Sequence, residues 1–216
     1  MSRDVGIELS EDLAIGYDRV LARVASSISL GEGTHYLLAR NGRGKTTLLR
    51  SLAGVLKLKS GVTGVRGVAQ FVAEDIYYDK HLTPKSILSC VLPKENVKSC
   101  LEFADKVELD VSKTFRELST GNKRKVSWLM AEFSCLPGEG DVLLLDEPFT
   151  GIDSHVRELF MEYWAENEVG VCRLVSCHPD FNSMKIESAL LISEGEICAT
   201  SKDEEYTWGE LKNSLV

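Results

Sequence analysis

The residues with the clearest chemical potential lie at positions 39–47, which read ARNGRGKTT. They fit the phosphate-binding pattern G-x-x-x-x-G-K-[ST], with an alanine in place of the first glycine. Gly42 and Gly44 allow backbone N–H groups to turn toward phosphate oxygens, and a helix that starts near Lys45 adds the positive end of its dipole. In this pattern Lys45 reaches the β and γ phosphates, and Thr46 holds Mg²⁺. The predicted nucleotide contacts are Asn41, Gly42, Gly44, Lys45, Thr46 and Thr47.

A second candidate element is the stretch DVLLLDEP at positions 141–148, an apolar run that ends in two acids. A buried strand in an open α/β sheet would place both acids at its carboxyl edge, where ligands bind in such sheets. There Asp146 would support Mg²⁺ through a water molecule, and Glu147 would polarise an attacking water. Together with the phosphate-binding pattern, the two acids indicate hydrolysis of a bound nucleotide.

These side chains need a sheet whose strand ends bring them together, and the apolar pattern of the chain predicts one. Short apolar or alternating runs predict strands, and apolar residues at helical spacing predict helices. The predicted strands are Gly6–Leu9, Val24–Leu30, Tyr36–Leu38, Val65–Val72, Val142–Leu145, Cys172–Ser176, Ala189–Ile192 and Glu196–Ala199. The predicted helices run from the phosphate loop to Leu56, through much of 75–135, over Ser154–Glu166 and through the last ten residues.

Strands that alternate with helices, with nearly continuous apolar runs in the middle strands, indicate an α/β fold with a parallel sheet covered on both faces. Between residues 75 and 135 the pattern changes to amphipathic helices, with breaks at Pro84 and Pro93. A chain of 216 residues is expected to form one domain. We therefore expect residues 1–74 and 136–216 to form the core and residues 75–135 to form an inserted helical subdomain.

The composition excludes several classes of protein. A net charge of −8 argues against a protein that coats nucleic acid, and no apolar run approaches the length of a membrane-spanning helix. The N-terminal MSRDVGIELSEDL has acids where a secretory signal needs an apolar segment, so the chain is expected to stay in the cytosol. Six scattered cysteines without a CxxC pair argue against zinc and favour reduced, mostly buried thiols.

A third element, LSTGN at positions 118–122, is followed by KRK and lies between the first two. With these residues the chain resembles the ATP-binding cassette (ABC) ATPases, the nucleotide-binding subunits of ABC transporters, over nearly its whole length. LSTGN is similar to the family's LSGGQ signature, from which Thr120 and Asn122 depart. The resemblance implies ATP and Mg²⁺ as cofactors. It also implies a P-loop NTPase core with a mostly parallel sheet, an N-terminal antiparallel β portion and an inserted helical subdomain.

The resemblance also assigns roles to single residues. Tyr17 occupies the place of the aromatic residue that stacks on adenine, and His178 matches the histidine that reaches the γ-phosphate. Ser119 and Gly121 belong to the signature, and Asp153 matches the aspartate that faces the partner subunit. The implied catalytic residues are Lys45, Glu147 and His178, and the implied metal ligands are Thr46, Asp146 and Glu74.

The position of the family's metal-binding glutamine loop has two candidates. Gln70 is the only glutamine in the chain. The family usually has about eight residues between this position and a Leu-Thr pair, and counting back from Leu82-Thr83 gives Glu74. We prefer Glu74, because a glutamate could still ligate Mg²⁺ through its carboxylate. Gln70 would then be an ordinary strand residue.

The resemblance implies a working unit of two chains. Ser119 and Gly121 can approach a γ-phosphate only from another molecule, so two copies would enclose two ATP molecules head to tail. A separate membrane-embedded permease would dock on the helical subdomain, near Tyr77 and Leu82. The chain would then be cytoplasmic and peripheral to the inner face of the membrane, with no nucleic-acid partner and no membrane insertion of its own.

Three functions remain open for such a chain. The short length and the DEPFTGID stretch favour the ATPase subunit of an exporter. A soluble ABC ATPase that acts on ribosomes or in DNA repair is the second. The third is a regulatory module that binds ATP with little turnover; Ala39, Asn122 and Glu74 favour it, and an intact Glu147 and His178 argue against it.

Several other polar residues have simpler interpretations. Arg40 and Arg43 could contact phosphate, although such loop side chains more often face solvent. His35, His81 and His155 have no partners in the sequence and are predicted to lie at the surface. The basic residues at positions 123–125 are either a solvated face or the start of the family's signature helix.

Overall fold

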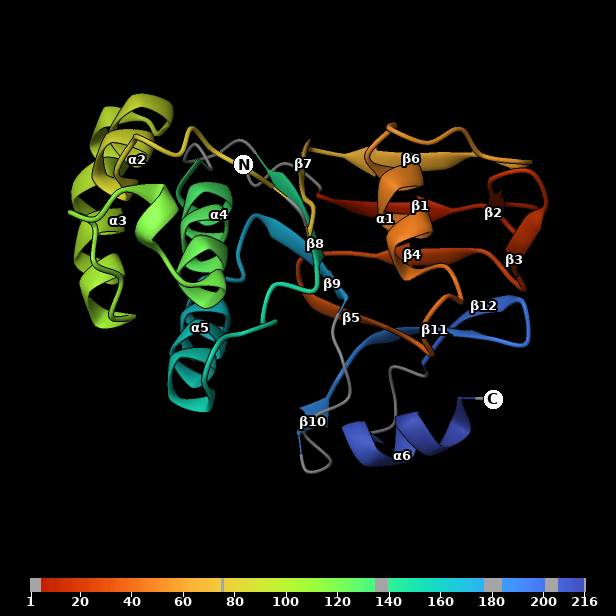
Figure 1. Ribbon diagram of the computed structural model, residues 1–216. Coiled ribbons are helices and arrows are strands. Elements are labelled where there is room, and N and C mark those ends of the chain that lie inside the picture. Colours follow the sequence, from red (N-terminus) through yellow and green to blue (C-terminus); the bar gives the residue numbers. More distant parts are fainter. Residues whose placement is uncertain (1–4, 75, 135–139, 177–183, 201–205, 216) are drawn as a thin grey trace.

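The computed structural model describes residues 5–74, 76–134, 140–176, 184–200 and 206–215, and its elements are arranged as in Figure 1. The strands are β1 (Gly6–Leu9), β2 (Ala14–Gly16), β3 (Val20–Val24), β4 (Ile28–Leu30), β5 (Gly33–Ala39), β6 (Thr63–Arg66), β7 (Val68–Val72), β8 (Asp141–Asp146), β9 (Val171–Ser176), β10 (Lys185–Ile186), β11 (Ala189–Ser193), β12 (Glu196–Ala199) and β13 (Tyr206–Thr207). The helices are α1 (Lys45–Leu52), α2 (Pro84–Val91), α3 (Lys94–Lys106), the 3₁₀ turn η1 (Phe115–Glu117), α4 (Thr120–Ser134), α5 (Ser154–Glu166) and α6 (Trp208–Ser214).

The main sheet has eight strands in the order β2-β3-β12-β11-β5-β9-β8-β7. Its central strands β11, β5, β9, β8 and β7 are parallel neighbours, whereas β11–β12 and β2–β3 pair antiparallel. A separate antiparallel sheet of three strands, in the order β4-β1-β6, comes largely from the N-terminal part of the chain. The predicted α/β fold with a mostly parallel sheet and an N-terminal antiparallel portion is therefore confirmed.

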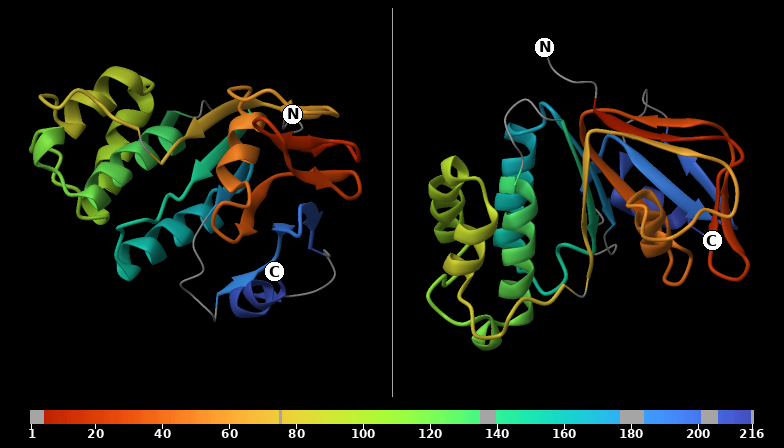
Figure 2. Two further views of the ribbon diagram at one scale, coloured as in Figure 1. Left: turned by 45° about the vertical axis from the view of Figure 1, so that its right-hand side comes forward. Right: turned by 90° about the horizontal axis from the view of Figure 1, so that it is seen from above.

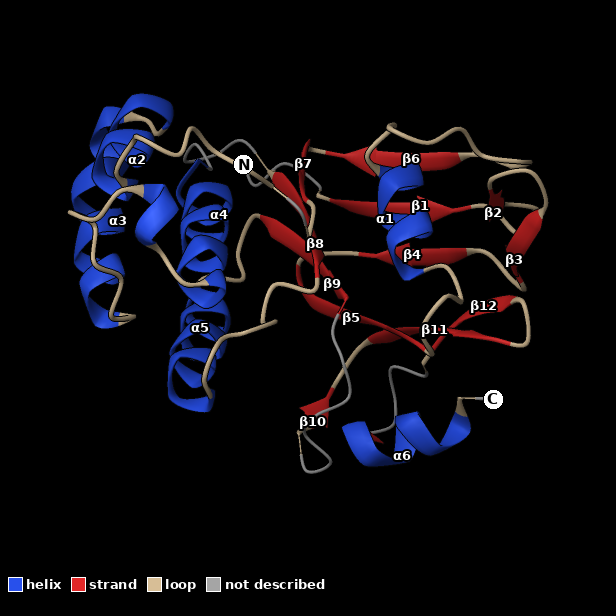
Figure 3. Cartoon of the chain, viewed as in Figure 1, coloured by secondary structure: helices blue, strands red, loops and turns tan. Residues whose placement is uncertain are grey.

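Strand β8 shows why the middle of the sheet must be covered on both faces. Its side chains point alternately to opposite faces, and all of them are buried. Val142 and Leu144 pack into a core with α1 and the antiparallel sheet. Leu143 and Leu145 pack into a second core with the helices α2–α5. The views in Figures 2 and 3 show these helices gathered on one side and the antiparallel sheet on the other.

Two predicted strands are each divided in the structure. The segment Val24–Leu30 belongs to β3 and β4, which lie in different sheets. The segment Val65–Val72 is divided at Gly67, whose φ is 120° and whose Cβ, if present, would lie 2.5 Å from the carbonyl oxygen of Gly140. Only glycine adopts this backbone conformation readily, so the chain changes sheets there.

Helix α1 is also shorter than predicted. It ends at Leu52, and the backbone N–H groups of Val55 and Leu56 both donate to the carbonyl of Arg50. Gly54, with φ 71°, provides the left-handed turn that commonly follows a helix. Leu56 therefore lies in this turn and not in the helix.

Helix α4 connects the helical side of the molecule to the sheet. It packs against α2, α3 and β7. Near its end the Glu132 carboxylate accepts from Arg173 Nε and Nη2 of β9, at 2.9 and 2.8 Å, and from Trp164 Nε1 of α5 at 2.7 Å. The side chains of Glu132 and Arg173 are each only 1% exposed, so α4 is attached to the sheet by a buried ion pair.

In the described part of the chain, no helix has both the length and the apolar character needed to cross a membrane. The described cysteines divide evenly: Cys100 and Cys172 are buried, and Cys90 and Cys198 are exposed. The prediction of mostly buried thiols is thus wrong for the latter two. Burial raises the pKa of Cys100 and of Cys172 to about 12, which keeps both thiols protonated near neutral pH.

Candidate functional site

The predicted phosphate loop connects β5 to α1, as the motif requires. Gly42 and Gly44 have φ values of 75° and 114°, in the region that favours glycine. The N–H of Leu48 donates to the carbonyl of Gly44, so the first helical bond starts from this loop. The loop therefore ends in the N-terminus of α1, whose free N–H groups and dipole favour a phosphate anion.

Lys45 and Glu147 form an ion pair at the carboxyl edge of the sheet. Lys45 Nζ lies 3.4 Å from Glu147 Oε1 and donates to the carbonyl of Ala39 at 3.3 Å. Both side chains are more than 90% buried. Ala39 itself ends β5 without a positive φ, so alanine is tolerated at the first position of the motif. The structure thus brings the predicted phosphate-binding lysine and the predicted base together.

Ser176 joins the two acids at the end of β8, and it was not predicted. Its hydroxyl donates to Asp146 Oδ1 at 2.8 Å and accepts from the backbone N–H of Glu147 at 3.0 Å. Asp146 pairs with Ser176 across the parallel strands β8 and β9, so both residues lie at the same edge. Glu147 follows with φ 50°, a conformation uncommon for glutamate. The sequence signal available for Ser176 was its place at the end of the predicted strand Cys172–Ser176.

The oxygen donors around this edge fit Mg²⁺. The predicted ligands Thr46, Asp146 and Glu74 offer one hydroxyl and two carboxylates, the hard oxygens that Mg²⁺ prefers. No group of three or more His, Cys, Asp or Glu residues that could enclose a metal occurs within the described ranges. Hydroxyl and carboxylate oxygens are the ligands that hold Mg²⁺ together with substrate phosphates.

Tyr17 lies in the turn between β2 and β3, next to α1. Its side chain is 49% exposed, and Arg50 Nη1 in the last turn of α1 donates to its hydroxyl at 3.4 Å. This contact places Tyr17 beside the last turn of α1, whose first turn follows the phosphate loop. An exposed ring at this place is able to stack on a base.

The predicted signature lies at the start of α4. The Ser119 hydroxyl accepts from the N–H of Asn122 at 3.2 Å, so Ser119 caps α4 and remains exposed. Gly121 is buried, and a Cβ on it would lie 2.2 Å from the carbonyl oxygen of Gly151. The signature glycine therefore packs against the loop 150–153 of the same chain.

Asp153 caps α5 within its own chain. Its carboxylate accepts from the N–H of Val156 at 3.0 Å, and this hydrogen bond is the main cause that lowers its pKa. His178, the predicted γ-phosphate residue, lies outside the described residues. In the sequence His178 follows Ser176, the last residue of β9, by two positions.

The two glutamine-loop candidates lie at different depths of the sheet. Gln70 pairs with Leu143 in the middle of the parallel ladder. Glu74 follows the last residue of β7 by two positions, at the edge where Asp146 ends the neighbouring strand. Its carboxylate lies 3.3 Å from Arg124 Nη2 of α4.

Two predictions about polar side chains are wrong. His35 is only 8% exposed, because its Nδ1 contacts Ser188 Oγ at 2.7 Å and its Nε2 donates to the carbonyl of Gly31 at 2.9 Å. The interpretation of positions 123–125 as a solvated face fails for Arg124 and Lys125, which are buried. Lys125 Nζ donates to the carbonyl of Val107 at 2.7 Å, and burial lowers its pKa. His81, His155, Arg40 and Arg43 are exposed, as predicted.

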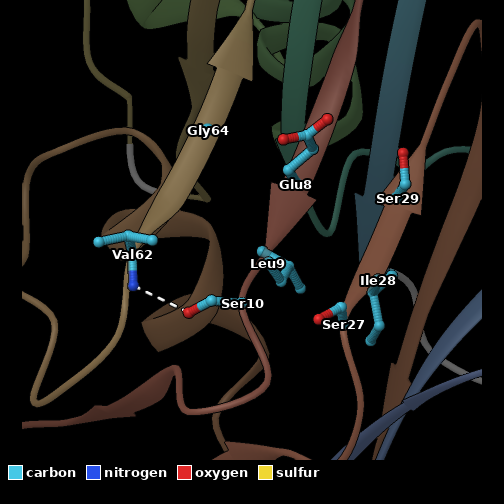
Figure 4. A pocket seen from close by; sticks show the side chains of 8 residues that line it. All are labelled: Glu8, Leu9, Ser10, Ser27, Ile28, Ser29, Val62 and Gly64. Atoms are coloured by element: carbon cyan, nitrogen blue, oxygen red, sulfur yellow. Dashed lines mark hydrogen bonds between the residues drawn. The ribbon is translucent and has the colours of Figure 1, made fainter.

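A hollow in the structure lies away from these residues, on the antiparallel sheet (Figure 4). It is lined by Glu8, Leu9, Ser10, Ser27, Ile28, Ser29, Val62 and Gly64. The N–H of Val62 donates to Ser10 Oγ at 3.0 Å across it. Its lining contains none of the predicted nucleotide residues, so the candidate site remains the edge of the main sheet.

Comparisons with known proteins agree with this geometry. Residues 21–150, more than half of the chain, match the sequence model of the family described as "ABC transporter". The chain is 32% identical to the ABC transporter ATP-binding protein YtrB of Bacillus subtilis over 76% of its own length and 60% of that protein's. It is 31% identical to the cytochrome c biogenesis ATP-binding export protein CcmA of Novosphingobium aromaticivorans, over 67% and 73% of the two lengths.

Solved structures show the same fold. A putative ABC transporter ATP-binding protein from Pyrococcus furiosus superposes with a TM-score of 0.64 at 24% identity, over 80% of this chain and 92% of that chain. A bacterial Atm1-family ABC exporter with ATP bound gives 0.74 at 15% identity, over 99% of this chain and 41% of that chain. The chain spans 60% and 64% of two of the curated relatives, YtrB and a Methanocaldococcus jannaschii protein.

Proposed function

The chain belongs to the ABC transporter ATP-binding family, and from this premise we propose that it binds and hydrolyses ATP to power a membrane transporter. The observation that carries the proposal is the edge of the main sheet. There Lys45, Asp146 and Glu147 are buried at the ends of neighbouring elements, and Glu147 lies 3.4 Å from Lys45. The glycine loop, the helix N-terminus and Lys45 favour a polyanionic ligand, and the two buried carboxylates beside them favour a cation bound with it.

The residues of this edge have separate tasks in the proposed reaction. The N–H groups of the phosphate loop and the Lys45 ammonium bind the phosphates. Thr46 and Asp146 would hold Mg²⁺, which would supply positive charge to offset the charge that develops on the phosphates. Glu147 accepts the proton of the attacking water. Lys45 lies 3.4 Å from Glu147, so phosphate oxygens that draw the ammonium toward them would leave the carboxylate free to orient that water.

The complete site is proposed to need two chains. Ser119 is exposed at the N-terminus of α4, and its hydroxyl contacts only its own helix among the described interactions. We expect this surface and Asp153 to meet the γ-phosphate held by a second copy. Closure of the head-to-tail pair would enclose two ATP molecules, and reopening after hydrolysis would move an attached permease.

The permease is proposed to dock on the helical side, close to Tyr77, which is 83% exposed, and Leu82, which is 45% exposed. Exposed aromatic residues such as Tyr77 are enriched at contact surfaces between proteins. Export is the proposed direction, supported by the DEPFTGID stretch and by the similarity to an export protein; the thiamine import protein ThiQ of Histophilus somni is also among the similar proteins. The proposed location is the cytoplasmic face of the membrane.

Light scattering of the Glu147→Gln variant tests this proposal. With Mg²⁺ and ATP, which this variant should bind without turnover, we expect roughly twice the monomer mass, and with ADP the monomer mass. The control is Ser119→Arg in the same background, whose bulky charge at the proposed contact should keep the chain monomeric with ATP. A monomer with ATP, or an unchanged dimer in the Ser119→Arg control, would contradict the head-to-tail arrangement.

A further inference from the structure

Two opposite charges from distant parts of the sequence meet beside the proposed site. Arg124 lies in the second turn of α4, and its Nη2 is 3.3 Å from the Oε1 of Glu74. The arginine side chain is 10% exposed, whereas the glutamate side chain is 57% exposed. Packing therefore holds the guanidinium in place, and the carboxylate has room to turn.

Glu74 lies at the edge of the sheet where Mg²⁺ is proposed to bind. Strand β7 runs parallel to β8 with Val72 opposite Leu145, so the chain leaves β7 at the edge where Asp146 and Glu147 end the next strand. A carboxylate at this edge is a ligand of the kind that Mg²⁺ prefers. The two oxygens of this carboxylate offer several lone pairs, but a guanidinium and a metal ion bound to the same group repel each other, so each weakens the binding of the other.

We propose that Arg124 is a positioning residue that competes with the metal for Glu74, so that Glu74 exchanges from Arg124 to Mg²⁺ when Mg²⁺ and ATP bind. This inference rests on the proposed Mg²⁺–ATP site. In the metal-free chain Arg124 neutralises Glu74, which limits repulsion with the carboxylates of Asp146 and Glu147. With metal bound, Arg124 loses this partner.

The exchange has a structural consequence for α4. Ser119 and Gly121 begin this helix, and Arg124 lies one turn beyond them. The far end of α4 stays attached to β9 through the buried pair of Glu132 and Arg173. Release of Arg124 therefore loosens the signature end of α4 only, and the metal site is linked to the surface proposed to meet the second chain.

A Mg²⁺ titration tests the competition. The binding of a fluorescent, non-hydrolysable ATP analogue is measured against Mg²⁺ concentration for the parent chain, Arg124→Gln, Glu74→Gln and the double variant. We expect Arg124→Gln to lower the Mg²⁺ midpoint about two- to five-fold, the size of a partly exposed ion pair. Glu74→Gln should raise it, and Arg124→Gln should change nothing further in that background.

The control variant is Arg124→Lys, which keeps the charge and should stay close to the parent. An unchanged or raised midpoint in Arg124→Gln overturns the proposal, as does an equal decrease in the Glu74→Gln background, which would indicate a general charge effect. A parent chain that binds no analogue at any Mg²⁺ concentration would instead contradict the proposed function.

Hydrogen exchange gives a second measurement that needs no change at the buried arginine. In the metal-free chain, Glu74→Gln should make the backbone amides of residues 121–126 exchange about two- to five-fold faster than in the parent, because their tether is lost. The matched control is Glu102→Gln, which breaks the exposed pair with Lys98 on α3 and should leave these amides unchanged. Equal exchange in Glu74→Gln and the parent overturns the proposal.

Discussion

The edge of the main sheet and the N-terminal end of α4 both carry residues predicted to contact ATP, yet they are built differently. At the sheet edge Lys45, Asp146 and Glu147 are at most 8% exposed, and their polar atoms contact one another, Ser176 or the carbonyl of Ala39. At the end of α4, Ser119 is exposed and caps its own helix. The first region is preorganised within one chain, whereas the second presents donors outward.

The two regions also differ in what a substitution would disturb. A substitution at the sheet edge changes the charge balance between buried groups, so we expect it to affect the rate of ATP hydrolysis most. A change at the signature alters a surface, with the exception of Gly121, which packs against Gly151 inside the chain. Variants in each region can therefore separate turnover, stability and nucleotide binding.

The largest expected effect belongs to Glu147→Gln. The amide keeps the shape and an oxygen of the side chain but cannot accept the proton of the attacking water. We expect ATP turnover to fall by about 10²-fold or more, the scale of general base catalysis, while ATP binding persists. Single-turnover hydrolysis beside a nucleotide-binding assay measures both. Unchanged turnover would remove Glu147 from the chemistry and weaken the distinction between the two regions.

The next effect is expected from Gly121→Ala, at the signature. The added methyl group would meet a backbone carbonyl at 2.2 Å, which cannot move aside as a flexible side chain could. We expect the free energy of unfolding to fall by about 2–3 kcal/mol, the upper part of the range for overpacking. Urea unfolding of the isolated chain measures it. The matched control is Gly31→Ala, where an added Cβ meets nothing within 4 Å. Equal stabilities for the two variants would make Gly121 a purely intermolecular residue.

The smallest effect is expected from Tyr17→Ala. Stacking of a base on an aromatic ring contributes about 1–3 kcal/mol, and the 49% exposure of Tyr17 favours the lower part of this range. ATP and GTP should be weakened to similar extents, because stacking does not read the edge of the base. Titration with fluorescent nucleotides measures it, with Tyr17→Phe as a control that keeps the ring and loses the contact with Arg50. Equal affinity in Tyr17→Ala and the parent would assign Tyr17 to packing.

The sequence predicts the sheet edge well because its residues are contiguous. The glycine pattern, the lysine and the acidic pair each lie next to a strand or helix whose apolar residues identify it. The divided strands were harder to predict. An apolar run such as Val65–Val72 does not indicate that its two halves belong to different sheets. Gly67 was the available signal, since a glycine inside a strand pattern often indicates a close backbone approach.

Contacts between distant residues could not be predicted from one sequence. Neither Glu74 with Arg124 nor Ser188 with His35 shares a local pattern, so His35 was predicted at the surface and the surroundings of Arg124 stayed open. Ser176 could be predicted in part. The predicted parallel sheet puts the end of its strand at the same edge as Asp146, but it gives neither the strand order nor the register. Ser176 was therefore missed at the sheet edge, where Lys45, Asp146 and Glu147 were predicted.

The buried pair of Glu132 and Arg173 has a consequence for how the protein unfolds. Separating the pair would leave a charge in a dry environment, which typically costs 3–5 kcal/mol, so α4 cannot leave the sheet gradually. Trp164 shares the same carboxylate, which extends the restraint to α5. We therefore expect the helical layer and the sheet to melt in a single cooperative transition on heating, since strand β8 contributes side chains to both hydrophobic cores.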